Sequence, residues 1–167
     1  MARITLIRHG KAETPMAGKQ DIDRSLITRG QQNAAAVGGF IAAHKMLPQL
    51  VLVSPAVRTR ETYEYIKLHW PDNIEAKYVD ALYEASASTL LHAIIDHAGD
   101  LSDVAVIGHN PSLVVLLNHM VCDGHAEQNL GYFPTCCTAD IGFVAPKICD
   151  IISDEGRLLS IKRARDL

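Results

Sequence analysis

The sequence predicts an α/β protein, a three-layer α/β/α sandwich around a mostly parallel mixed sheet with an antiparallel edge. Three observations favour this class. Apolar runs typical of strands alternate with helical patterns along most of the chain. The runs at 4–7 and 104–107 are continuously apolar, as parallel strands buried on both faces are. Two late runs, at 139–144 and 158–163, are joined by a connection containing proline and glycine, which predicts the antiparallel edge.

The segment after the first strand predicts a long loop and then a helix. Residues 11–25 carry charges, glycine and proline without any periodicity, which is typical of a loop over the end of a strand. An apolar face over 28–44 predicts the helix. Gly38 and Gly39 each cost about 1 kcal/mol in a helix relative to alanine, and close packing against the sheet would explain both.

The middle of the chain continues the alternation. An apolar strand over 50–53 is followed by Ser54 and Pro55, which suit the N-cap and the first position of a helix over 56–68. The same patterns predict the remaining elements: a strand over 76–79, a helix capped by Ser86 or Ser88, a strand over 104–108, a buried apolar helix over 113–121 after an Asn110-Pro111 cap, and a loop over 123–135.

Length and charge restrict the kind of protein. A chain of 167 residues fits a single domain over 1–167, because one core of this size buries about two-thirds of the unfolded surface. A formal net charge of -3 gives no basic field of the kind that nucleic acids require. The uncharged stretch 104–122 contains His109 and Asn110, which a membrane span would have to bury. We therefore expect no nucleic-acid or membrane contact and, without a signal-peptide pattern, a cytoplasmic protein.

The cysteines and histidines do not predict a metal site. Four cysteines include the adjacent pair Cys136 and Cys137 but no C-x-x-C motif, which fits reduced thiols better than a disulfide framework. His119, Cys122 and His125 are spaced by three residues, but they straddle a helix end and lack a fourth ligand. We expect neither a metal ion nor a cofactor.

Two expected strands end in histidine. Arg8, His9 and Gly10 follow the first strand, and His109 follows a later one. Ligands of open α/β sheets lie beyond the carboxyl ends of the strands, so these side chains should share one site. A phosphoryl group carries close to two negative charges, which guanidinium groups bind with paired hydrogen bonds. Arg8 and Arg58 would supply these cations.

A neutral His9 could attack phosphorus and hold the phosphoryl group covalently. Its attacking nitrogen must lack a proton, which a hydrogen bond from the other ring nitrogen to a backbone carbonyl would ensure. His109 would donate to a phosphoryl oxygen. Arg60 lies on a different helix face from Arg58, so we expect only Arg58 to point inward. The two helix starts expected nearby would add partial positive charge.

Four motifs, in the same order and spread over most of the chain, resemble those of the histidine phosphatase superfamily, and most closely its short SixA-like branch of phosphohistidine phosphatases. The motifs lie at residues 6–10, 23–30, 54–62 and 106–110. The resemblance implies a phosphoglycerate mutase-like fold and metal-independent hydrolysis through a phosphohistidine on His9. It places Arg8, Arg58 and His109 in the phosphate pocket.

The resemblance also places a general acid at Glu84, which would protonate the leaving group of an ordinary phosphate ester. Three carboxylates near the first motif remain open alternatives: Glu13, Asp21 and Asp23. We expect substrate contacts from Gly10, Lys11 and Asn110. Many relatives have an acidic residue where this chain has Lys11, which would add a positive charge at the mouth of the pocket.

The favoured substrate is a phosphohistidine carried by a protein, such as a histidine-phosphotransfer domain. Short segments separate Arg58 from Glu84 and Glu84 from His109, which leaves no room for the helical insertion that encloses small substrates in larger relatives. A small phosphorylated molecule is the alternative, cleaved by a broad-specificity phosphomonoesterase or a phosphoglycerate-mutase-like enzyme. A phosphate-binding module without turnover is a third possibility, but it predicts that a pocket residue is missing, and none is.

Overall fold

The computed structural model describes residues 1–121, 133–153 and 155–167. Within these ranges, six strands form one sheet in the order β3-β2-β4-β1-β5-β6. The strands are β1 (Arg3–Arg8), β2 (Leu50–Val53), β3 (Glu75–Tyr78), β4 (Asp103–Gly108), β5 (Thr138–Gly142) and β6 (Arg157–Lys162). The α-helices of the same ranges are α1 (Thr28–Ala43), α2 (Val57–Ile66), α3 (Ala87–Ala98) and α4 (Ser112–Met120).

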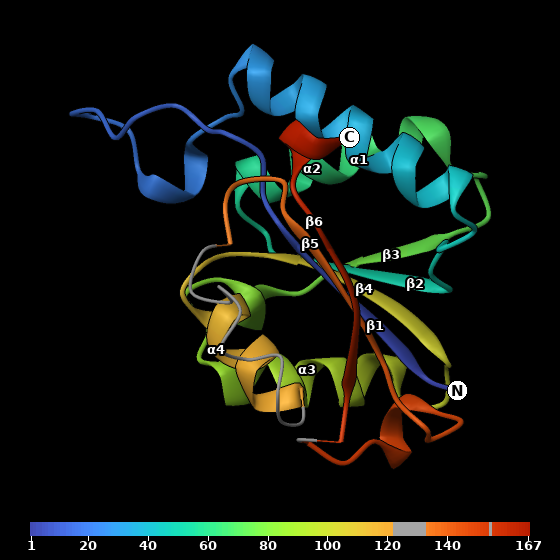
Figure 1. Ribbon diagram of the computed structural model, residues 1–167. Coiled ribbons are helices and arrows are strands. Elements are labelled where there is room, and N and C mark those ends of the chain that lie inside the picture. The colour runs from blue at the N-terminus through green and yellow to red at the C-terminus, as the bar shows by residue number, and fades with distance from the viewer. Residues whose placement is uncertain (122–132, 154) are drawn as a thin grey trace.

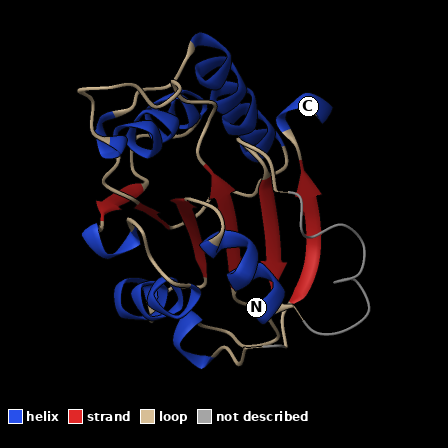
Figure 2. Ribbon diagram, turned by 90° about the vertical axis from the view of Figure 1, so that its left-hand side faces the viewer, coloured by secondary structure: helices blue, strands red, loops and turns tan. Residues whose placement is uncertain are grey.

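Helices cover both faces of the sheet. Helices α1 and α2 pack together on one face, and α3 and α4 pack on the other (Figure 1). Seen from the side, the strands lie between two helical layers (Figure 2). The pairs β3-β2, β2-β4 and β4-β1 are parallel, whereas β5 and β6 extend the sheet in the antiparallel sense. The predicted fold class is therefore confirmed.

The parallel strands contribute to two cores at once. In β1, Ile4 and Leu6 belong to the core beneath α3 and α4, whereas Ile7 belongs to the core beneath α1 and α2. Strand β2 covers the predicted residues 50–53 and is buried throughout. Because successive side chains point to opposite faces and both faces are covered, the buried positions of these strands are almost all apolar.

Two helix starts differ from the cap predictions. Helix α3 follows Ser86 as predicted, and the Ser86 hydroxyl accepts a backbone N–H of the first turn at 3.1 Å. Helices α2 and α4 begin without a side-chain cap. The predictions that Ser54 and Asn110 cap these helices are wrong, because both side chains hydrogen-bond elsewhere in the fold.

Helix α4 is only partly buried, contrary to the prediction. Val115 on its outer face is 54% exposed, while Leu113, Leu116 and Leu117 are buried in the core. An almost uniformly apolar helix shows no periodicity from which its outer face could be predicted.

The described residues form neither a membrane-spanning helix nor a cluster of metal ligands. In the part of the chain that the structure describes, no helix is long and apolar enough to cross a membrane. Among the same residues, no group of three metal-binding side chains is arranged around a common point. His119 is exposed on α4, and Cys122 and His125 lie outside the described residues.

Gly38 allows α1 to contact α2 rather than the sheet. A Cβ atom at Gly38 would lie 2.2 Å from the carbonyl oxygen of Ile66, and the indole N–H of Trp70 donates to the Gly38 carbonyl at 3.1 Å. The prediction that both glycines pack against the sheet is therefore wrong. A Cβ atom at Gly39 would meet nothing closer than the His69 ring at 3.9 Å.

We expect Gly38→Ala to destabilise the protein by several kcal/mol, because helices α1 and α2 would have to separate. Gly39→Ala is the matched control, since the neighbouring site has room and alanine favours helix by up to about 1 kcal/mol. Urea denaturation of both variants measures the difference. Equal stability of the two variants would contradict the packing described for Gly38.

Candidate active site

The pairing of β1 with β4 brings the two predicted histidines together. Arg8 lies opposite Gly108 in the sheet, and the N–H of His9 donates to the Gly108 carbonyl at 3.1 Å. The ring centroids of His9 and His109 lie 5.2 Å apart. Strand β2, on the other side of β4, places Ser54 beside them. Three parallel strands thus end at one place.

The ring of His9 is buried and held in one tautomer. Its Nδ1 lies 2.7 Å from the carbonyl oxygen of Gly10. A carbonyl only accepts hydrogen bonds, so Nδ1 carries the proton and Nε2 carries a lone pair. Burial and, to a lesser extent, the nearby His109 and arginines lower the pKa of His9 to about 3, although the hydrogen bond with Gly10 acts in the opposite direction. The imidazole is therefore neutral at ordinary pH.

His109 is held between a hydroxyl and a guanidinium. Its Nε2 lies 2.7 Å from the Ser54 hydroxyl, and its Nδ1 lies 3.3 Å from Nη2 of Arg58. An arginine only donates, so Nδ1 accepts and the proton of the neutral ring points to Ser54. Burial, followed by the charge of Arg58, lowers the pKa of His109 to about 4. In this arrangement neither ring nitrogen offers a proton to a phosphoryl oxygen.

Arg58 points inward from the first turn of α2, whereas Arg60 is exposed. The Arg58 guanidinium donates to the carbonyl of Asp21 at 2.6 Å and to its carboxylate at 2.9 Å. Tyr83 donates to the same carboxylate at 3.0 Å, and its ring meets His109 edge-on. Burial would raise the pKa of Asp21, but the hydrogen bonds from Tyr83 and Arg58 outweigh it and lower the pKa.

The side chains of Arg8 and Asn110 bind the same backbone carbonyl. The Arg8 guanidinium and the Asn110 amide each donate to the carbonyl oxygen of Phe133 at 2.9 Å. The neighbouring Cys136 supports the same strand end, because its N–H lies 3.1 Å from the carbonyl oxygens of both Arg8 and His9. Burial raises the pKa of the Cys136 thiol to about 12, which makes it a structural residue without reactivity.

Gly10 and Lys11 lie differently from the expected substrate contacts. The N–H of Gly10 donates to the Thr62 hydroxyl at 2.9 Å, so Gly10 orients His9 instead of presenting a free donor. Lys11 is exposed and lines a separate cavity beside the site. Gly30 allows this segment to contact α1, because a Cβ atom there would lie 2.2 Å from the Lys11 carbonyl oxygen.

The four carboxylates proposed as acids lie in different surroundings. Glu84 is exposed, has a positive φ of 52° and makes no hydrogen bond or ion pair with a described residue. Glu13 holds the loop through Lys19, and that hydrogen bond lowers its pKa. Asp23 is exposed. Of the four, Asp21 is the carboxylate in contact with Arg58.

A sequence profile of the histidine phosphatase superfamily (branch 1) matches residues 4–93, which is more than half of the chain. The chain belongs to this superfamily. The predicted resemblance is confirmed, and the converging side chains Arg8, His9, Arg58 and His109 all come from the motifs on which that resemblance rests.

This histidine phosphatase chain is similar to a curated relative and to solved structures. An uncharacterised protein of Mycobacterium tuberculosis is 32% identical over 110 residues, a match that spans 66% of this chain and 66% of that protein. The crystal structure of a candidate phosphohistidine phosphatase SixA from Agrobacterium tumefaciens is 27% identical, with a TM-score of 0.81 over 97% of both chains. The protein histidine phosphatase SixA complexed with tungstate shares the fold, with 20% identity and a TM-score of 0.74 over 98% of this chain and 97% of that one.

The structure adds partners to the site that sequence reasoning missed. The sequence pattern predicts a helix cap at Ser54 and gives no role to Tyr83 or Thr62. Each of these side chains has a hydrogen-bond partner 52 to 62 positions away in the chain, which adjacent residues do not indicate. The Ser-Pro pair of the histidine phosphatase motif was the one signal for Ser54.

We expect the two neutral histidines to make the protein less stable as the pH falls below about 6.5. Each histidine binds a proton with a pKa near 6.5 when unfolded but only near 3 (His9) or 4 (His109) when folded. The unfolded state therefore binds more protons in this range, and stability falls by about 1.6 kcal/mol per histidine between pH 6.5 and 5.

Chemical denaturation of the wild type and of His9→Gln at several pH values measures this effect. Between pH 6 and 4.5, the free energy of unfolding should fall less steeply with decreasing pH in His9→Gln than in the wild type, by about 1.4 kcal/mol per pH unit. The reason is that unfolding of the variant takes up about one proton fewer. Parallel stability curves for the two proteins would contradict a neutral, buried His9.

Proposed function

We propose that this chain is a phosphatase that forms a covalent phosphohistidine on His9. The orientation of the His9 ring carries the proposal, because its Nδ1 is bound to the Gly10 carbonyl and its Nε2 lone pair is available for attack. Arg8 and Arg58 bring two permanent positive charges to the same strand ends. Membership of the histidine phosphatase superfamily supports the same activity.

The reaction has two steps. The Nε2 lone pair of His9 bonds to phosphorus while the bond to the leaving group breaks, and the leaving group takes the electron pair of that bond and a proton from solvent. Water then attacks phosphorus, the P–N electron pair returns to the imidazole, and inorganic phosphate leaves as a proton passes to solvent. Arg8 and Arg58 stabilise the charge on the equatorial oxygens in both steps. A dianion that draws Arg58 away would let His109 bind a proton on Nδ1 and donate it as a hydrogen bond.

A protein phosphohistidine is the proposed substrate. Asp21 is an ion-paired carboxylate with a lowered pKa, and Glu84 is exposed, so neither is prepared to protonate an alkoxide. An imidazole leaving group depends less on such an acid. Between α2 and α3 the chain forms only β3 and short 3-10 turns, without a helical cover over the site. The structural neighbours named SixA support the same substrate class.

The test compares a phosphorylated histidine-phosphotransfer domain with a panel of sugar and nucleotide phosphates. We expect kcat/KM for the phosphorylated domain to exceed that for every small phosphate by at least tenfold. A preference for a sugar or nucleotide phosphate would favour the small-molecule alternative. Phosphate binding without release of inorganic phosphate from any substrate would contradict the enzyme altogether.

Three further expectations accompany this proposal. The reaction is metal-independent, so EDTA should leave the rate unchanged. Residues 1–167 act as one domain. The protein works in the cytoplasm, where the free thiols of Cys136, Cys137 and Cys149 would stay reduced.

A further inference from the structure

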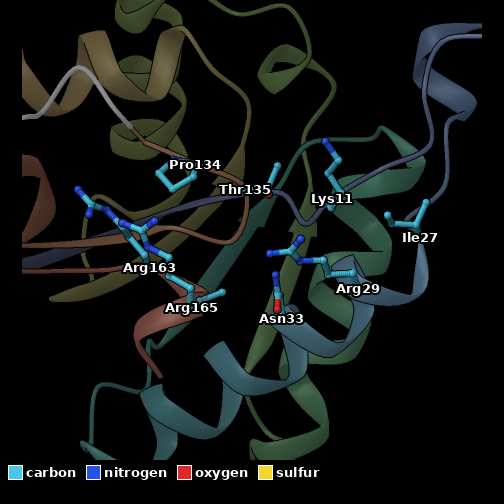
Figure 3. Close-up of a pocket in the computed structure, with 9 residues that line it drawn as sticks. Lys11, Ile27, Arg29, Asn33, Pro134, Thr135, Arg163 and Arg165 are labelled. Atoms are coloured by element: carbon cyan, nitrogen blue, oxygen red, sulfur yellow. The ribbon is translucent and has the colours of Figure 1, made fainter.

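A positively charged cavity lies beside the phosphate pocket. Its volume is about 310 Å³, and four basic side chains line it: Lys11, Arg29, Arg163 and Arg165. Figure 3 shows that Arg29 comes from α1, whereas Arg163 and Arg165 come from the C-terminal segment. These are four of the chain's 16 basic residues, gathered in one place on a protein of net charge -3.

Two of these basic side chains have no partner of opposite charge among the described residues. The side chains of Lys11 and Arg29 make no hydrogen bond or ion pair with a described residue, and Arg165 pairs loosely with Asp166 at 3.6 Å. No carboxylate is among the described residues that line the cavity. Gathering like charges is unfavourable unless an anion offsets them. The arrangement therefore suits an anionic ligand.

Two segments of the chain connect the cavity with the phosphate pocket. Lys11 follows His9 by two residues, so their Cα atoms lie within about 7.6 Å of each other. On the other side, Thr135 lines the cavity, and two residues before it the Phe133 carbonyl anchors Arg8. One ligand that places its phosphoryl group against His9 can therefore reach the cavity with an adjacent part.

Resting on the proposed function, we propose that this cavity binds an acidic segment of the protein substrate, close to the phosphorylated histidine. Aspartate or glutamate carboxylates would pair with Arg29 and Arg165. The remaining lining includes the apolar side chains of Ile27 and Pro134, which suit a peptide better than a free inorganic anion. Lys11 lies at the junction and would contact the part of the segment nearest the phosphoryl group.

Charge reversal at Arg29 and Arg165 tests this assignment. Glutamate suits the first turn of a helix, so Arg29→Glu should fold, and Arg165 lies exposed in a C-terminal 3-10 turn. The matched control is Arg157→Glu, an equal change of charge at the exposed opposite end of β6. Steady-state kinetics are measured with a phosphorylated histidine-phosphotransfer domain and with p-nitrophenyl phosphate.

We expect Arg29→Glu and Arg165→Glu each to raise KM for the phosphorylated domain about tenfold, with a far smaller change for p-nitrophenyl phosphate. Arg157→Glu should change neither. A hexaglutamate peptide should inhibit cleavage of the domain competitively, while malonate at the same carboxylate concentration should not.

Unchanged KM for the domain in both variants would overturn the inference while leaving the proposed function intact. Equal losses on both substrates would also overturn it, because the residues would then act on the catalytic site or the fold. Equal inhibition by malonate would assign the cavity to free anions instead. A wild-type enzyme inactive on the domain would refute the proposed substrate, and this inference with it.

Discussion

Replacing His9 with alanine is expected to lower kcat for p-nitrophenyl phosphate by roughly 10³-fold or more, because the variant lacks the atom that bonds to phosphorus. The remaining arginines still bind phosphate, so the loss should fall on kcat and not on KM. Steady-state kinetics measure both constants.

His97→Ala is the matched control for this variant, since His97 is exposed on α3 and lies outside every motif. It should retain wild-type activity. A radiolabelled substrate provides a second readout: after an alkaline quench, label should stay on the wild-type protein and be absent from His9→Ala. Full activity in His9→Ala would refute the proposed nucleophile.

Arg58→Ala should lower kcat/KM by roughly 10²- to 10³-fold, because a buried, preorganised cation is removed from the place where negative charge develops. Arg58→Lys should recover little of this loss, since an ammonium group cannot reproduce two parallel hydrogen bonds to phosphoryl oxygens. Kinetics with p-nitrophenyl phosphate measure the ratio between the variants.

Arg60→Ala controls for the loss of a positive charge from the same helix. Arg60 is exposed and lies over the ring of Tyr78, at 5.2 Å from its centroid, so its removal should change kcat/KM less than twofold. Equal losses for Arg58→Ala and Arg60→Ala would indicate a general electrostatic effect and would contradict a specific phosphate contact by Arg58.

Most of the scaffold was predictable because its central strands are buried on both faces. Strand β2 occupies the predicted residues 50–53, and β1 and β4 extend the predicted runs by one or two residues. Helix ends were harder to predict. Serine and asparagine are common N-cap residues. In the structure, however, the Ser54 side chain hydrogen-bonds with His109 and the Asn110 side chain donates to the Phe133 carbonyl, so neither caps its helix.

The site was predictable to the extent that chemistry limits residue types. A phosphate is bound by cations, and ligands of open α/β sheets lie beyond the carboxyl ends of the strands. The motifs at these strand ends therefore indicated Arg8, His9, Arg58 and His109. Their hydrogen-bond partners could not be predicted. Nothing near Glu84 in the sequence indicates that its neighbour Tyr83 is the side chain that reaches Asp21.

The fold class, the strand ends that meet and the residues suited to phosphate could be predicted from the sequence, because these predictions depend on local patterns of burial and on side-chain chemistry. How each residue is held depends on tertiary contacts, namely the tautomer of His9, the ion pair of Arg58 with Asp21, and the gathering of Lys11 with Arg29 and Arg165 in one cavity. These contacts join segments far apart in the chain, and only the register of the sheet and the packing of helices bring such segments to the same place.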